Sequence, residues 1–70
     1  MNEGTKLFEK VQEFYINGGY EFEVKKAEYN DLEVAIMDCN ESLYQNEYEG
    51  YVEKVAENID GTILLRYIEE

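Results

Sequence analysis

Apolar residues recur at every third or fourth position near the start of the chain. Five of them fall on one helical face within residues 5–17, namely Leu7, Phe8, Val11, Phe14 and Tyr15. Gly18 and Gly19 follow, and glycine readily adopts the left-handed conformation found at helix ends. The pattern therefore predicts a helix over residues 5–17 that ends at Gly18.

Two later segments alternate between apolar and other residues with a period of two. In residues 20–25 every second residue is Tyr, Phe or Val, and the residues between them are charged. Residues 32–37 alternate in the same way through Leu, Val and Ile. This period is typical of half-buried strands, and Asn30 and Asp31 between the segments favour a turn. A β-hairpin over about residues 20–39 is predicted.

Residues 42–59 fit two structures. As a helix they place one apolar arc on a single face, made of Tyr44, Tyr48, Tyr51, Val52, Val55, Ala56 and Ile59. Ser42 and Gln45 have the spacing of a capping box at the start of such a helix, and Gly61 could end it. The alternative is a strand over residues 47–57, which Gly50 and the tyrosines favour.

The last apolar segment, residues 62–68, is interrupted only by Arg66 and is typical of a strand covered on much of both faces. Residues 1–70 are expected to form a single small α+β domain, because a chain of this length has room for one core. The expected order is helix–strand–strand–helix–strand with an antiparallel hairpin. The alternative is one helix on a four-stranded antiparallel sheet, in which residues 47–57 join strand 62–68 through residues 58–61.

Composition indicates a folded and strongly acidic protein. Hydrophobic residues make up 44% of the chain, which is too many for intrinsic disorder, and the formal net charge is −11. This charge repels nucleic acid and the anionic face of a membrane but attracts basic proteins. With one cysteine, no expected signal peptide and no apolar stretch near the ~20 residues that cross a bilayer, a cytoplasmic location is expected.

The acids are concentrated in one part of the chain. Residues 1–30 hold six acids and four bases, a sum of −2, whereas residues 31–70 hold eleven acids and two bases, a sum of −9. No base separates the eight acids between Lys26 and Lys54, which are Glu28, Asp31, Glu33, Asp38, Glu41, Glu47, Glu49 and Glu53. If residues 42–59 are helical, Glu49, Glu53 and Glu57 form a row on one face. Tyr29, between Glu28 and Asp31, is the aromatic residue expected at an interface.

Catalytic and metal-binding residues are sparse. The chain has no histidine, one cysteine (Cys39) and one serine (Ser42), so no activated nucleophile is expected, and a domain of this size has little wall for a carboxylate-lined cleft. Six residues match the ligand positions of an EF-hand calcium loop, namely Asp38, Asn40, Ser42, Tyr44, Asn46 and Glu49. Leu43 stands where that loop needs glycine, so an ordinary polar connection is favoured. No enzyme activity, metal or cofactor is expected.

In length, charge, tyrosine content and mixed helix-and-hairpin layout, the chain resembles the small acidic DNA mimics of bacteriophages and mobile elements. These include anti-CRISPR, anti-restriction and uracil-glycosylase inhibitors. The resemblance implies that carboxylates stand in for phosphates and occupy the basic groove of a nucleic-acid-binding host-defence protein in the bacterial cytoplasm. The expected partner-binding residues are Glu28, Tyr29, Asp31, Glu33, Asp38, Glu41, Glu47, Glu49, Glu53 and Glu57.

A different class of function remains open. The chain could be a small structural or regulatory interaction module whose acidity serves only solubility. Such a module could be a monomer, or a homodimer in which strand 62–68 pairs with the same strand of a second copy.

Overall fold

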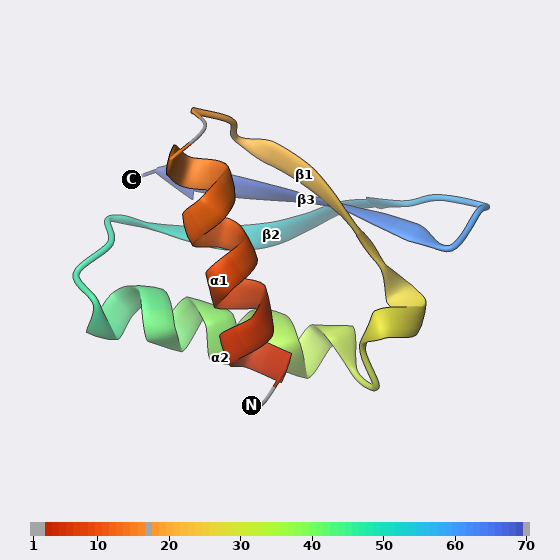
Figure 1. Ribbon diagram of the computed structural model, residues 1–70, viewed down its shortest axis with the longest axis horizontal. Coiled ribbons are helices and arrows are strands. Elements are labelled where there is room, and N and C mark those ends of the chain that lie inside the picture. The colour runs from red at the N-terminus through yellow and green to blue at the C-terminus, as the bar shows by residue number, and fades with distance from the viewer. Residues whose placement is uncertain (1–2, 17, 70) are drawn as a thin grey trace.

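Two helices lie on one face of a three-stranded antiparallel sheet in the computed structural model, which describes residues 3–16 and 18–69 (Figure 1). The elements in chain order are α1 (Glu3–Ile16), β1 (Glu21–Lys25), the short 3-10 helix η1 (Lys26–Glu28), α2 (Leu32–Gln45), β2 (Gly50–Glu57) and β3 (Thr62–Glu69). The strands are arranged in the order β1-β3-β2. The fold is therefore α+β, as the sequence indicates, although the second helix precedes two strands.

Helix α1 confirms the first prediction as far as Ile16, and residue 17 lies outside the described residues. Leu7 and Val11 are fully buried on its inner face. Gly18 follows the helix with a φ of 77°, in the left-handed region, and its N–H donates to the carbonyl of Tyr15 at 3.0 Å.

The predicted hairpin over residues 20–39 is half right. Its first strand is β1, but residues 32–45 form helix α2, so the predicted second strand is wrong. The alternation over residues 32–37 also fits a helical period, and that period continues further along the chain: the buried residues of α2 are Leu32, Ala35, Cys39 and Leu43. Asp31 begins the helix, since its Oδ1 accepts from the Val34 N–H at 3.3 Å.

Over residues 42–59 the strand alternative is confirmed and the helix is wrong. Ser42 and Gln45 belong to the last turn of α2, and β2 forms an antiparallel hairpin with β3. The Asn58 N–H donates to the Thr62 carbonyl at 2.9 Å, and Gly61 turns the chain with a φ of 89°. The tertiary pairing with β3 outweighs the helical spacing of the apolar residues.

Strand β3 confirms the last predicted element and lies in the centre of the sheet. Its buried residues Ile63, Leu65 and Tyr67 face the helices, and Val24 of β1 and Val52 of β2 flank them in the core. Both edges of β3 are hydrogen-bonded within the chain. Pairing of strand 62–68 with a partner strand, which was one possibility, is therefore wrong, because that strand has no free edge.

Asn40 attaches α2 to the free edge of β2. Its side-chain oxygen accepts from the Val52 N–H at 2.7 Å, and its amide nitrogen donates to the Val52 carbonyl at 3.1 Å. The two bonds reproduce what a neighbouring strand would supply. They fix α2 beside β2 and thereby determine which of its faces is exposed.

Candidate acidic protein-binding surface

The side of α2 that faces away from the core is acidic and apolar. Residues advance by about 100° per position, so the exposed positions lie opposite the buried row that ends at Leu43. We call them the α2 outer face: Glu33, Val34, Met37, Asp38, Glu41, Tyr44 and Gln45. Helix α2 contains no lysine or arginine. Nothing on the helix itself neutralises these carboxylates.

The two sides of this face lie toward different elements. Asp38 lies toward α1, because a Cβ placed on Gly4 would collide with the Asp38 Cβ where the helices cross (Figure 1). Met37 and Tyr44 lie toward β2, on the side of the helix from which Asn40 reaches Val52. Glu33 lies on the same side as Met37 and Tyr44, since it lines a groove with Lys54 of β2, and the helical spacing places Val34 between Glu41 and Asp38. Acidic and apolar side chains therefore alternate across the outer face.

Three exposed apolar residues were not predicted as functional. Val34, Met37 and Tyr44 have 49%, 70% and 83% of their surface exposed. Tyr44 was expected on a core face, which is wrong. Once residues 32–45 are recognised as a helix with a buried row at Leu32, Ala35, Cys39 and Leu43, the same spacing places these three on the opposite side.

Flanking loops add acids at both ends of α2. Glu28 lies in η1, and Asp31 is the N-cap of α2. Glu47 and Glu49 lie in the connection from α2 to β2, and Glu47 adopts a φ of 64°. These four carboxylates extend the acidic surface of α2 in both directions along the chain.

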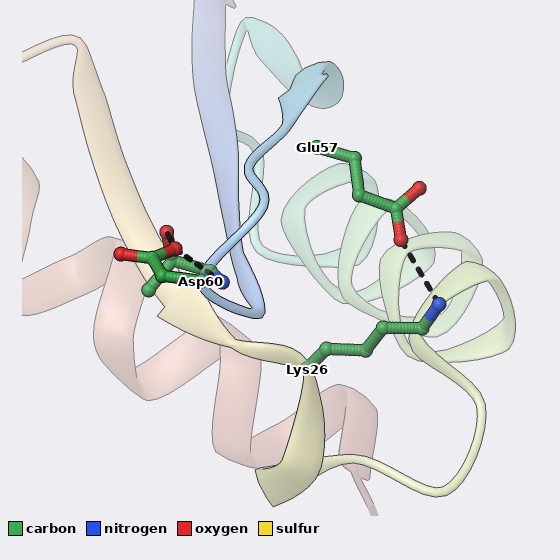
Figure 2. Close-up of polar contacts among 4 residues, drawn as sticks. Lys26, Glu57 and Asp60 are labelled. Atoms are coloured by element: carbon green, nitrogen blue, oxygen red, sulfur yellow. Dashed lines mark hydrogen bonds and ion pairs between the residues drawn. The ribbon is translucent and has the colours of Figure 1, made fainter.

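Glu53 and Glu57 do not belong to this surface. Glu53 lies on the strand β2, opposite Arg66 of β3, on the face of the sheet that the helices leave uncovered. Glu57 forms an ion pair with Lys26, in which Oε1 is 3.0 Å from Nζ (Figure 2). The predicted helical row of Glu49, Glu53 and Glu57 is wrong, because β2 is extended.

Two carboxylates near the β2–β3 turn, Glu57 and Asp60, have partners within the chain. The hydrogen bond and charge of Lys26 lower the pKa of Glu57, and Lys54 adds a smaller effect. Figure 2 also shows Asp60, whose pKa is lowered because its Oδ1 accepts from the hydroxyl and the N–H of Thr62. These carboxylates stay ionised through interactions within the chain and need no external cation.

Tyr29 is a core residue, which corrects the prediction that it lies at an interface. It is only 7% exposed, and the Lys6 ammonium lies 4.7 Å from the centre of its ring. Burial, with Glu28 as the next cause, raises the pKa of its hydroxyl. Lys6 also donates to the Glu28 carbonyl at 2.9 Å, so this contact joins α1 to η1.

A groove of about 390 Å³ opens between the start of α2 and the second half of β2. Leu32, Ile36 and Ile63 contribute apolar surface to its lining, and both signs of charge surround them, with Lys54 beside Glu33. Asp31 and Glu33 of the acidic surface line this groove together with Lys26 and Lys54, so two bases lie near the start of α2.

The EF-hand alignment is wrong, because residues 38–45 are helical and cannot wrap around an ion. In residues 3–16 and 18–69, no three Cys, Asp or Glu side chains are grouped so that they could hold a metal ion. Over the same residues, neither helix has the length and apolar character needed to span a membrane. No protein-family model matches the sequence, and no curated protein or solved structure is significantly similar to it.

Proposed function

We propose that this chain is a non-catalytic binding protein that places its acidic α2 surface in the basic groove of a nucleic-acid-binding host-defence protein, in the cytoplasm of a bacterial host. One observation carries the proposal. Of the eight base-free acids between Lys26 and Lys54, all except Glu53 lie on α2 or the segments that flank it. We call them the α2 acidic band: Glu28, Asp31, Glu33, Asp38, Glu41, Glu47 and Glu49.

The spacing of the band approaches that of a nucleic-acid strand. From Asp31 to Glu41 the helix rises about 15 Å, at about 1.5 Å per residue. The carboxylates of Asp31, Glu33, Asp38 and Glu41 are thus about 5 Å apart along the axis on average. One strand of DNA carries a phosphate about every 3.4 Å. A groove lined with lysine and arginine can accept either array.

The exposed apolar residues of the α2 outer face argue against acidity that serves only solubility. Exposed Met37 and Tyr44 would lower solubility, yet both lie beside the acids. Tyrosine is enriched among the residues that carry binding energy, and methionine adapts to varied surfaces. A protein partner would use both kinds of side chain, the carboxylates for steering and the apolar ones for tight contact.

Charge-neutral variants can test the proposal. The first, Glu33→Gln, Asp38→Asn and Glu41→Gln, removes three charges from the α2 outer face. A matched control, Glu9→Gln, Glu53→Gln and Glu69→Gln, removes three exposed charges elsewhere. Each tagged protein is incubated with extract of a bacterial host at 50 and 500 mM NaCl, with and without duplex DNA, and bound proteins are identified by mass spectrometry.

We expect the unmodified chain and the control to retain a basic nucleic-acid-binding protein at low salt. The α2 variant should lose it, and both DNA and high salt should release it, because the Debye length shortens as ions are added. Equal losses from the α2 variant and the control, or retention that DNA does not reduce, would contradict the proposal. Tyr44→Ala should also weaken binding while leaving its salt dependence unchanged.

A further inference from the structure

The two edge strands of the sheet, β2 and β1, differ in how well they are protected against pairing with another strand. At the β2 edge, Asn40 occupies both the N–H and the carbonyl of Val52, and a bulge interrupts the strand between Lys54 and Ala56. Bonded side chains and bulges both hinder the addition of another strand. The β1 edge has no such protection in the described residues, where β3 is the strand that pairs with β1.

The hydrogen-bond pattern identifies the free groups of β1. Tyr67 N–H donates to the Tyr20 carbonyl at 2.8 Å and Lys26 N–H donates to the Gly61 carbonyl at 2.9 Å, so even-numbered residues between them point toward β3. Antiparallel strands alternate, and the N–H and carbonyl groups of Glu21, Glu23 and Lys25 therefore point outward. They form a template for one more antiparallel strand.

We propose that the β1 edge pairs with the β1 edge of a second copy of this chain, joining two sheets into one. In the register that uses the whole strand, Glu23 meets its symmetry mate on the two-fold axis, and Glu21 lies opposite Lys25 of the other copy. Each such hydrogen-bonded pair exchanges two backbone bonds. The two Glu–Lys pairs attract, with Glu21 also 3.4 Å from Arg66 of its own chain. The single Glu–Glu pair on the axis repels, and each Glu23 accepts from Asn58 of its own chain at 3.2 Å.

Phe22 is the partly exposed apolar residue that this register brings next to the second copy. Phe22 lies opposite Val24 of the other copy, on the side of the sheet that carries the helices. Next to Phe22 is an open groove of about 220 Å³, which Phe14 of α1 also lines. Val24 is only 1% exposed within its own chain and adds no contact, so the apolar surface that the second copy would meet is that of Phe22 and this groove. The pairing would therefore cover apolar surface that the single chain leaves partly exposed.

The charge distribution explains why a copy can approach at this edge despite the net charge of −11. Residues 1–30, which include β1, sum to −2, whereas residues 31–70 sum to −9. Helix α2 packs beside β2, at the opposite side of the sheet from the β1 edge (Figure 1). The dimer would keep the part of each acidic band that lies on α2 and after it away from the two-fold axis, whereas Glu28 lies in η1 directly after β1. The dimer is independent of what those bands bind.

Sedimentation equilibrium of the full chain between 10 μM and 1 mM, at 150 mM NaCl, tests the pairing together with charge variants. We expect a dimer that forms below 1 mM. Glu23→Gln should tighten it about threefold, since the repulsion on the axis disappears, and Lys25→Glu should weaken it about tenfold, since both attractive pairs become repulsive. Glu9→Gln and Lys54→Glu change the net charge equally away from the edge and should have smaller effects.

Hydrogen exchange distinguishes this dimer from one formed elsewhere. As the concentration rises, the amides of Glu21, Glu23 and Lys25 should become protected, while those of Phe22 and Val24 are already protected by β3. A chain that stays monomeric at 1 mM would overturn the proposal. So would a dimer that Lys54→Glu weakens as much as Lys25→Glu, or one that leaves the three outward amides unprotected.

Discussion

The contact between Asn40 and Val52 should be among the polar interactions that stabilise the fold most. Val52 is 2% exposed, and both of its outward backbone groups bond to the Asn40 side chain at 2.7 and 3.1 Å. Each neutral hydrogen bond contributes about 1 kcal/mol, and an unpaired buried partner adds a desolvation cost. Asn40→Ala should therefore lower the free energy of unfolding by about 2 to 3 kcal/mol. A domain of this size has about 4 to 10 kcal/mol in total.

Asn40→Asp gives a sharper test, because its effect depends on pH. The carboxylate still accepts from the Val52 N–H, but its second oxygen faces the Val52 carbonyl and repels it. This repulsion favours the protonated acid, so the pKa of the new group should be higher in the folded chain than in the unfolded chain. The loss in free energy of unfolding is complete at pH 7, where the new carboxyl is ionised in both the folded and the unfolded chain. It shrinks as the pH falls through the raised pKa, because the protonated acid donates to the Val52 carbonyl.

Urea unfolding followed by tyrosine fluorescence at pH 7 and pH 4 measures both effects, each relative to the unmodified chain. Asn30→Asp is the matched control, because Asn30 is exposed and its side chain makes no hydrogen bond among the described residues. The reasoning is refuted if Asn40→Ala costs less than about 0.5 kcal/mol, a typical surface value. It is also refuted if the penalty of Asn40→Asp is the same at both pH values.

Three further changes test the core. Leu65→Ala, at a fully buried position of the central strand, should cost about 3 kcal/mol in the same urea experiment, and a cost below about 1 kcal/mol would show that the site is not packed. Gly50→Ala should cost about 1 to 3 kcal/mol, because its Cβ would collide with the backbone carbonyl oxygen of Ile68 and lie 2.7 Å from the Tyr67 side chain, and an unchanged midpoint would contradict that close approach. Burial raises the pKa of Cys39 to about 12, so the thiol should react with a disulfide reagent at pH 8 only after urea is added. The unfolded thiol ionises near pH 9 while the folded one keeps its proton, so stability should fall between about pH 9 and 12 relative to Cys39→Ala.

The local pattern predicted α1, β1 and β3 because each has one hydrophobic period. Residues 32–36 fit two hydrophobic periods, since Leu32 and Ile36 are spaced both as residues on one face of a strand and as neighbours on a helix. The signal that separates the two lies further along the chain, where Cys39 and Leu43 continue the helical spacing. Asp31 was read as a turn residue but acts as an N-cap, and both roles use the same short carboxylate.

Strand β2 could be inferred only as an alternative, because its position depends on contacts distant in sequence. Most of its residues are exposed and only Val52 is buried, so its composition carries little information. What holds it is the ladder to β3 and the Asn40 bonds. The acidic site was also predicted only in part. Composition reveals the base-free run, but it does not reveal that Glu53 lies on a strand and therefore outside the acidic surface.

The hydrogen bonds of Asn40 bear on both proposals, the acidic binding surface and the dimer at the β1 edge. By bonding both outward groups of Val52, Asn40 fixes the rotation of α2, so that the acids at Asp38 and Glu41 face away from the sheet. The same bonds block the β2 edge, which leaves the β1 edge as the one available for pairing. A chain with two open edges could add copies at both and grow without limit, whereas one open edge pairing about a two-fold axis stops at a dimer. Such a dimer would carry two acidic bands, and a partner with two basic grooves would then bind more tightly than either band alone allows.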